Sequence, residues 1–325
     1  MNRRAIITLL GGAATWPIVA RAQQAAMPVV GLLASVSPPY EPFVSALKDG
    51  LQQTGYIEGR SVTIESLWAE GHYDRLPQQA SELVRRRVAV IILVGGGPTI
   101  AAAKAATTTI PIVFTMGDDP VKTGAVAALN HPGGNVTGIS LLTESMEPKR
   151  LQLLHELVPN VPVIAIIVNP SNPQADNQVH DLHGAAGDLG VQVQIFKAST
   201  PSEIEVAFAR LVERGAGALL MAADAFFNTR REQFVVLSSR HALPTIFPYR
   251  EFPAAGALMS YGPSLADAYR KAGNYAGRIL EGEAPSDLPV QQAVKIELII
   301  NLQTARALGI TVPLTLLGRA DEVIE

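Results

Sequence analysis

The sequence predicts an α/β protein with two lobes, each a parallel sheet covered by helices on both faces. Nearly continuous apolar runs, such as residues 89–94 and 163–168, alternate with helical patterns of 10–15 residues, which is typical of parallel strands buried on both sides. This alternation closes after residue 141 and restarts at residue 146, so two sheets are expected. The chain length of 325 residues also lies near the point at which single cores stop growing and chains divide into domains.

The first series opens with an apolar strand at 29–36. Phe43, Leu47 and Leu51 then follow at intervals of four and predict an amphipathic helix over 43–53, which Gly55 ends. The same reasoning predicts strands at 62–68, 89–94, 111–116 and 136–141, and helices at 73–86, 99–107 and 119–129.

The second series opens with a helix at 146–157 and a strand at 163–168. The run 191–197 alternates with period two, the pattern of a half-exposed edge strand. A Pro-rich linker at 283–290 favours a late crossing between the lobes. The remaining elements are helices at 175–189, 202–214, 226–242, 265–280 and 302–308, and strands at 217–223, 245–249, 257–261 and 294–300.

The first 22 residues have the pattern of a cleaved export signal. Arg3 and Arg4 precede an apolar run over 5–20, and Ala20-Arg21-Ala22 is a small-x-small cleavage site. The paired arginines favour the twin-arginine route, with the general secretory route as the alternative. A retained anchor is the other interpretation, but the apolar run is shorter than the roughly 20 residues of a spanning helix. We therefore expect a periplasmic protein cleaved near Ala22.

Composition excludes several classes of function. The chain contains no cysteine, which removes cysteine proteases, thiolate zinc sites, iron–sulfur clusters and a lipid anchor. A net charge of −3 without a basic block gives no nucleic-acid surface. No G-x-S-x-G elbow or phosphate-binding loop occurs. His180 and His183 share a helix with Asp176, but no third strong metal ligand is placed nearby. We expect no catalytic residue, metal or cofactor, and a monomer.

Ligands of open parallel sheets bind beyond the carboxyl ends of the strands, where helix N-termini offer unpaired N–H groups to anions. The loop 95–99 (Gly-Gly-Gly-Pro-Thr) lets a ligand approach the backbone closely, or it is simply a tight turn. Asp118, Asp119 and Asp224 begin predicted helices, where each pairs with a ligand ammonium or caps its helix. Aromatic side chains near the same loops either contact the ligand or belong to the core. Glu144 and Glu147 are interpreted as ordinary acids at a helix start.

The candidate ligand-binding residues are Ser35, Ser37, Tyr40, Trp68, Gly96, Gly97, Thr99, Gly117, Asp118, Asn169, Asn172, Asp224, Phe226, Tyr249 and Tyr261.

Several phrases carry a resemblance to a known family, among them GYIEGRSVTIESLWAEGHYDRLP, AAKAATTTIPIVFTMGDDPVKTGAVAALNHPGGNVTGIS and GITVPLTLLGRADEVIE. With these phrases the chain resembles, over essentially its whole length, substrate-binding proteins of ABC transporters, in the poorly characterised family that includes tryptophan-binding members. The resemblance implies the type I periplasmic-binding-protein fold, with two lobes joined by three crossovers. The lobes would be 27–141 plus about 262–284, and 142–261 plus about 285–325.

The same resemblance implies a small solute in the cleft, with an aromatic or branched amino acid as the candidate, and a membrane permease with its ATPase as partners. For an amino acid, we expect the carboxylate near Ser35, Ser37 and Thr99 and the ammonium on Asp118 or Asp224. The side chain would contact one or more of Tyr40, Trp68 and Phe226. Two alternatives remain open, a solute-binding sensor of the same fold and an exported lyase or isomerase.

Overall fold

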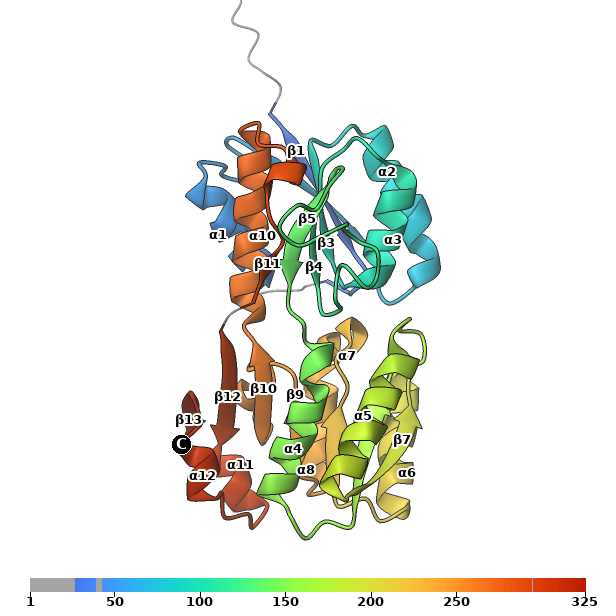
Figure 1. Ribbon diagram of the computed structural model, residues 1–325, viewed down its shortest axis with the longest axis vertical. Helices are drawn as coiled ribbons and strands as arrows, with labels where there is room; N and C mark the ends of the chain where they lie inside the picture. Colours follow the sequence, from blue (N-terminus) through green and yellow to red (C-terminus); the bar gives the residue numbers. More distant parts are fainter. Residues whose placement is uncertain (1–26, 39–42, 294) are drawn as a thin grey trace, which may run out of the picture.

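The computed structural model describes residues 27–38, 43–293 and 295–325, which form two α/β lobes stacked end to end (Figure 1). The predicted export signal lies outside the described residues, as does Tyr40. Within the part of the chain that is described, no helix is both long and apolar enough to cross a membrane.

The first lobe is built on a six-stranded sheet with the order β11-β5-β4-β3-β1-β2, in which every pair is parallel. Successive side chains of a strand point to opposite faces. Leu32 therefore packs towards one pair of helices and Leu33 towards the other, which explains why the strands are apolar throughout. The strands are β1 (Val29–Ala34), β2 (Thr63–Trp68), β3 (Val90–Val94), β4 (Ile112–Met116), β5 (Val136–Ser140) and β11 (Gln291–Gln292).

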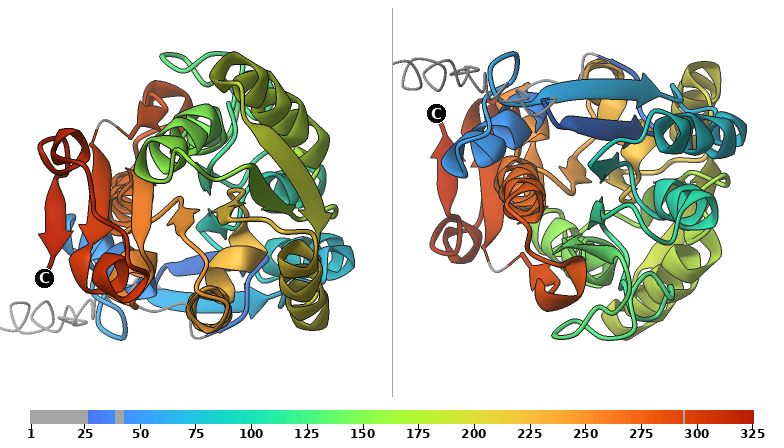
Figure 2. Two further views of the ribbon diagram at one scale, coloured as in Figure 1. Left: turned by 90° about the horizontal axis from the view of Figure 1, so that it is seen from below. Right: turned by 90° about the horizontal axis from the view of Figure 1, so that it is seen from above.

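Helices α1 (Phe43–Gln53) and α10 (Leu265–Leu280) cover one face of this sheet, and α2 (Leu76–Arg85) and α3 (Gly97–Ala106) cover the other (Figures 1 and 2). A short 3-10 helix, η1 (Tyr73–Arg75), leads into α2. Glycines let α1 and α10 pack very closely. A Cβ added at Gly50 would lie 1.9 Å from the carbonyl oxygen of Arg270, and the equivalent distance from Gly273 to the Leu47 oxygen is 2.0 Å.

The second lobe has a seven-stranded sheet with the order β13-β12-β10-β9-β8-β6-β7. Among the strands of the described residues, only β10 and β12 pair antiparallel. The strands are β6 (Val163–Val168), β7 (Gln192–Lys197), β8 (Ala218–Met221), β9 (Thr245–Phe247), β10 (Met259–Pro263), β12 (Ile296–Asn301) and β13 (Glu322–Ile324). The helices are α4 (Glu147–Leu157), α5 (Ala175–Leu189), α6 (Pro201–Glu213), α7 (Ala225–Thr229), α8 (Arg231–Arg240), α9 (Glu251–Ala254), α11 (Leu302–Ala307) and α12 (Leu314–Leu317).

The chain crosses between the lobes three times. The first crossing joins β5 to α4 through the 3-10 helix η2 (Glu144–Met146), the second joins β10 to α10, and the third joins β11 to β12. Because β11 pairs with β5 in the first sheet, the third crossing falls after Gln292, later than the expected boundary near residue 285. The preceding 3-10 helix η3 (Pro285–Asp287) also lies against β5, and the Thr137 hydroxyl donates to the Leu288 carbonyl at 2.6 Å.

The predicted fold class, two α/β lobes dominated by parallel strands, is confirmed, and β7 is indeed an edge strand. Two predicted helices are wrong. Residues 119–129 form turns, because the Asp119 carboxylate accepts the N–H groups of Val121 and Lys122 and thereby bends the backbone. The predicted helix 226–242 is divided into α7 and α8 at Arg230.

Candidate functional site

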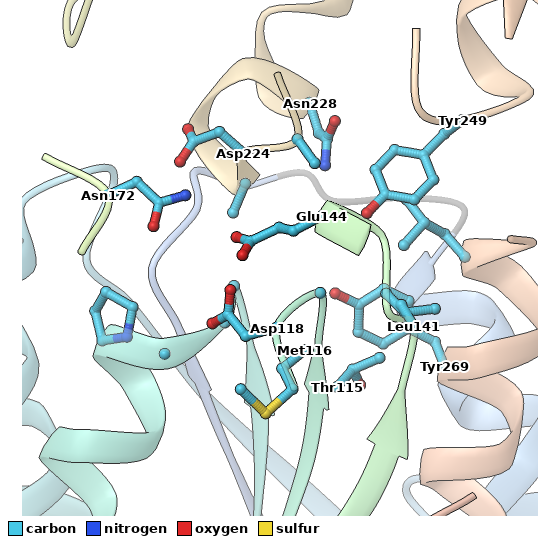
Figure 3. A pocket seen from close by; sticks show the side chains of 18 of the residues that line it. Thr115, Met116, Asp118, Leu141, Glu144, Asn172, Asp224, Asn228, Tyr249 and Tyr269 are labelled. Carbon is cyan, nitrogen blue, oxygen red and sulfur yellow. The ribbon is translucent and has the colours of Figure 1, made fainter. Parts of the chain in front are cut away.

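A pocket lies between the lobes, where the carboxyl ends of the two sets of strands face each other (Figure 3). The volume of this pocket that is open to the centre of a water molecule is about 70 Å³, which is below the roughly 300–1,000 Å³ that is usual for small-molecule sites.

The start of α3 forms one wall of the pocket. Gly95 and Gly96 have φ angles of +107° and +81°, which glycine adopts most easily, and no side chain caps the helix. The first N–H groups of a helix lack intrahelical partners, so this end can receive an anion. Ser35 and Thr99 serve the loop itself: their hydroxyls donate to the carbonyls of Gly95 at 3.2 Å and Gly96 at 2.7 Å. Neither hydroxyl residue lines the pocket.

The three predicted aspartates differ in what they do. Asp119 caps its turn, as described above. Asp224 caps α7 by accepting from the N–H groups of Phe226 and Phe227 at 3.0 and 3.3 Å, and it also accepts from Asn169 at 3.0 Å. Burial raises the pKa of Asp224, and these hydrogen bonds act in the opposite direction. Its carboxylate nevertheless reaches the pocket wall, so Asp224 is both a helix cap and a lining residue.

Asp118 is not a helix cap. Its side chain is only 8% exposed and points into the pocket (Figure 3). Within the described residues, no backbone N–H group and no basic side chain bonds to its carboxylate, and its neighbour is the carboxyl group of Glu144. A buried carboxylate with so few donors is costly unless a ligand supplies them. Asp118 therefore has the features of a ligand-binding acid.

Glu144 lines the pocket, although its sequence context predicts only an ordinary acid at a helix start. It lies in η2 on the first crossing, and its carboxyl group points between Asp118 and Asp224 (Figure 3). Burial raises its pKa well above the ordinary range, and the hydrogen bond with Asp118 and the nearby negative charges of Asp118, Glu147 and Asp224 raise it further. One feature of the sequence indicates a place at the pocket for Glu144. It comes just after the last strand of the first series, in a segment that must cross between the lobes.

The pocket thus has three acids and no lysine, arginine or histidine among its described lining residues. Arg250, which directly precedes α9, bonds to Glu297 and Glu322 on the second lobe and is not in the lining. Two polar atoms of the lining, Thr115 Oγ1 and Asn228 Oδ1, are buried without a hydrogen-bond partner. The pocket is therefore suited to a solute with a cationic group and additional hydrogen-bonding groups.

Aromatic side chains contribute three rings, Tyr73, Tyr249 and Tyr269. Tyr249 is held by a 3.2 Å hydrogen bond between its hydroxyl and that of Thr143. Burial raises the pKa of Tyr73, and the charge of Asp224 on the opposite lobe raises it further, so the two lobes approach one another at this point.

The structure brings seven predicted residues into the pocket lining: Gly96, Gly97, Gly117, Asp118, Asn172, Asp224 and Tyr249. Ser35, Ser37, Trp68, Thr99, Asn169, Phe226 and Tyr261 lie outside the lining. The three aromatic residues of this second group pack elsewhere. Trp68 and Tyr261 lie against the cores, and Phe226 packs against Phe227 and Arg230.

Two α/β lobes with a pocket between their loop edges define a two-lobed binding protein. The chain belongs to the family of ABC transporter substrate-binding proteins, whose model matches residues 30–324. This family consists of solute-binding proteins and not of enzymes.

Individual proteins agree with this assignment. The chain is 31% identical over 266 residues to the tyrosine-binding protein of Clostridioides difficile (strain R20291), which covers 82% of this chain and 75% of that protein. A conserved domain protein from Vibrio cholerae is 29% identical, with a TM-score of 0.79 over 91% of this chain and 99% of that one. A Streptococcus pneumonia protein solved with L-Trp has the same fold, at 23% identity and a TM-score of 0.78, with the same shares of each chain covered.

Proposed function

We propose that this protein binds an amino acid with an aromatic side chain in the interlobe pocket and delivers it to the permease of an ABC importer. The observation that carries the proposal is the presence of buried carboxylates on both lobes beside an uncapped helix start. An α-amino acid has a cationic and an anionic group on one carbon atom, so its site needs acceptors and donors close together.

The geometry meets this requirement. A Cβ atom at Gly97, on the first turn of α3, would lie 3.4 Å from Oδ2 of Asp118. The ammonium group is assigned to Asp118, with Asp224 approaching from the other lobe, and the carboxylate to the N–H groups at the start of α3. Tyr73, Tyr249 and Tyr269 then surround the side chain.

The relatives support an aromatic solute, because one is named for tyrosine and another was solved with L-Trp. The export signal read from residues 1–22 and the family membership support a location outside the cytoplasm, where an importer receives its solute. A solute that contacts both lobes favours the closed form through its differential affinity.

Isothermal titration calorimetry tests the solute. L-tyrosine, L-tryptophan, L-phenylalanine and L-leucine are compared with tyramine, which lacks the carboxylate, and 3-(4-hydroxyphenyl)propionate, which lacks the ammonium. We expect at least one aromatic amino acid to bind, and either deletion to weaken binding by about 100-fold or more. Binding of 3-(4-hydroxyphenyl)propionate as tight as that of L-tyrosine would contradict the ammonium assignment, and failure of all three aromatic amino acids to bind would overturn the proposed solute class.

A further inference from the structure

The pocket contains more negative charge than one ammonium group can neutralise. Asp118 comes from the loop after β4, Glu144 from the first crossing, and Asp224 from the start of α7 (Figure 3). These three segments belong to different parts of the chain, and they meet only because the lobes and the crossing converge here.

The groups that surround Glu144 do not neutralise this excess of negative charge. Arg150 is a described cation whose pKa the charge of Glu144 influences, but it lies outside the pocket lining, is fully buried and is already bonded to backbone carbonyls and Glu147. The titratable and charged groups facing Glu144 from the surrounding elements are Asp118, Asp224, Glu147, Arg150, Tyr73, Tyr249 and Tyr269. No described histidine lines the pocket, so the carboxyl groups are the acids there that can exchange protons near neutral pH.

Asp118 and Glu144 lie next to each other. Their carboxyl groups face each other inside the pocket (Figure 3), and two neighbouring carboxyl groups repel one another less when one of them holds a proton. Asp224 has a different environment, because three donors already bond to its Oδ1 and stabilise its charge. The shared proton therefore belongs to the Asp118–Glu144 pair.

We propose that a proton and the cationic group of the solute compete for the Asp118–Glu144 pair, so that the empty pair holds one proton and binding of the solute releases it to the solvent. This inference rests on the proposed function, because it takes a solute with an ammonium group. The solute keeps its own protons throughout, and the released proton leaves Glu144 or Asp118 as both become carboxylates facing the ammonium group.

The direction of the pH effect follows from this competition. Lowering the pH fills the pair with protons, so the apparent dissociation constant rises as pH falls, by up to about tenfold for each pH unit below the apparent pKa of the empty pair. The effect reaches neutral pH because burial raises the pKa of Glu144. The affinity of the protein thus depends on the acidity of its compartment.

A Glu144→Gln variant imitates the protonated pair, since its amide N–H donates to Asp118 at every pH. We measure binding of L-tyrosine between about pH 5 and pH 7, a range in which the charges of free tyrosine change little. Calorimetry in buffers of different ionisation enthalpy gives the number of protons released. We expect the wild type to lose affinity as the pH falls and to release part or all of one proton, while Glu144→Gln binds more weakly with an affinity that changes little with pH.

Wild-type binding that is independent of pH, with no proton released, would overturn the proposal and leave the proposed function intact. If L-tyrosine does not bind at any pH, the choice of solute fails instead. The pair is then tested without solute by carboxyl-carbon NMR. A signal that is absent from Glu144→Gln and that titrates well above the ordinary glutamate range supports the proposal, and ordinary titration of Glu144 in the empty protein refutes it.

Discussion

The guanidinium group of Arg150 donates a 2.7 Å hydrogen bond to the backbone carbonyl of Thr143, although its side chain is completely buried. It also donates to the carbonyl of Tyr261 at 3.2 Å. Thr143 lies on the first crossing and Tyr261 in the strand that leads to the second, so one side chain holds two of the crossings together. Glu147 faces the same guanidinium at 3.7 Å and accepts the N–H of Ala223, the residue before Asp224. This network therefore fixes the position of the first crossing and of the residue next to Asp224, which both border the pocket.

Replacing Arg150 should destabilise the protein strongly. In Arg150→Ala the buried Glu147 loses its cation, and breaking such a pair typically costs about 3–5 kcal/mol. The free energy of unfolding is measured by urea titration. We expect Arg150→Met combined with Glu147→Gln to be more stable than Arg150→Ala, because no buried charge is then left unpaired. Equal stability of the single alanine variant and the wild type would contradict the role of this network.

Asp118→Asn should separate binding from stability. The variant removes the carboxylate that we assign to the solute ammonium, so its affinity for the solute at pH 7.5 should fall by about tenfold or more. Its stability should be unchanged or higher, because the change relieves repulsion among the pocket acids. Calorimetry and thermal unfolding give the two quantities.

Asp119→Asn is the matched control for Asp118→Asn. The new amide oxygen can still accept the N–H groups of Val121 and Lys122, so both affinity and stability should change little. If the two substitutions weaken binding equally, the distinction between the two aspartates is wrong.

Gly97→Ala tests whether the solute lies against the first turn of α3. The added methyl group has room, with Asp118 Oδ2 at 3.4 Å as its one close neighbour, so the fold should persist. We expect the solute affinity to fall by about tenfold, because the methyl group prevents close approach to the helix N–H groups.

Gly184→Ala provides the comparison, because Gly184 is an exposed glycine within α5 with open space around it. Replacing a glycine in a helix by alanine stabilises it by about 0.5–1 kcal/mol. The control should therefore raise the melting temperature and leave binding unchanged. Unaltered affinity in Gly97→Ala would place the solute carboxylate elsewhere.

The buried Glu147 should make stability depend on pH. Burial raises the pKa of Glu147 to about 7, against the opposing effects of Arg150 and the Ala223 N–H. In the unfolded chain this group titrates near its ordinary value of about 4.3. The folded protein therefore keeps a proton that the unfolded chain loses between these values, and its free energy of unfolding falls as pH rises from about 4.3 to about 7.

The Glu147→Gln variant isolates this effect. One pKa unit corresponds to about 1.4 kcal/mol, so the difference in unfolding free energy between wild type and variant should change by an amount of the order of 3 kcal/mol over that pH range. Denaturant titrations at several pH values measure it. Parallel pH profiles for the two proteins would show that Glu147 does not titrate in this window.

Much of the architecture was predictable because its signals are local. An apolar run such as Val163–Val168 indicates a strand buried on both faces. The loop that follows each such strand lies at the carboxyl edge of the sheet. Asp118 and Asp224 follow such strands and therefore lie at the edge where the pocket is found. Residues 119–129 differ from the predicted helix because the Asp119 side chain imposes a turn.

The sequence alone therefore determined two sheets dominated by parallel strands, the edge strand β7 of the second sheet and the loops that face the pocket. Only the tertiary structure decided that Glu144 joins Asp118, that Arg150 links two crossings, and that Ser35 and Thr99 hold a loop without reaching the pocket. The physical reason is that periodicity along the chain reports which side of one element is buried. Contacts between lobes depend on how the crossing segments bend, and those segments carry no repeating pattern.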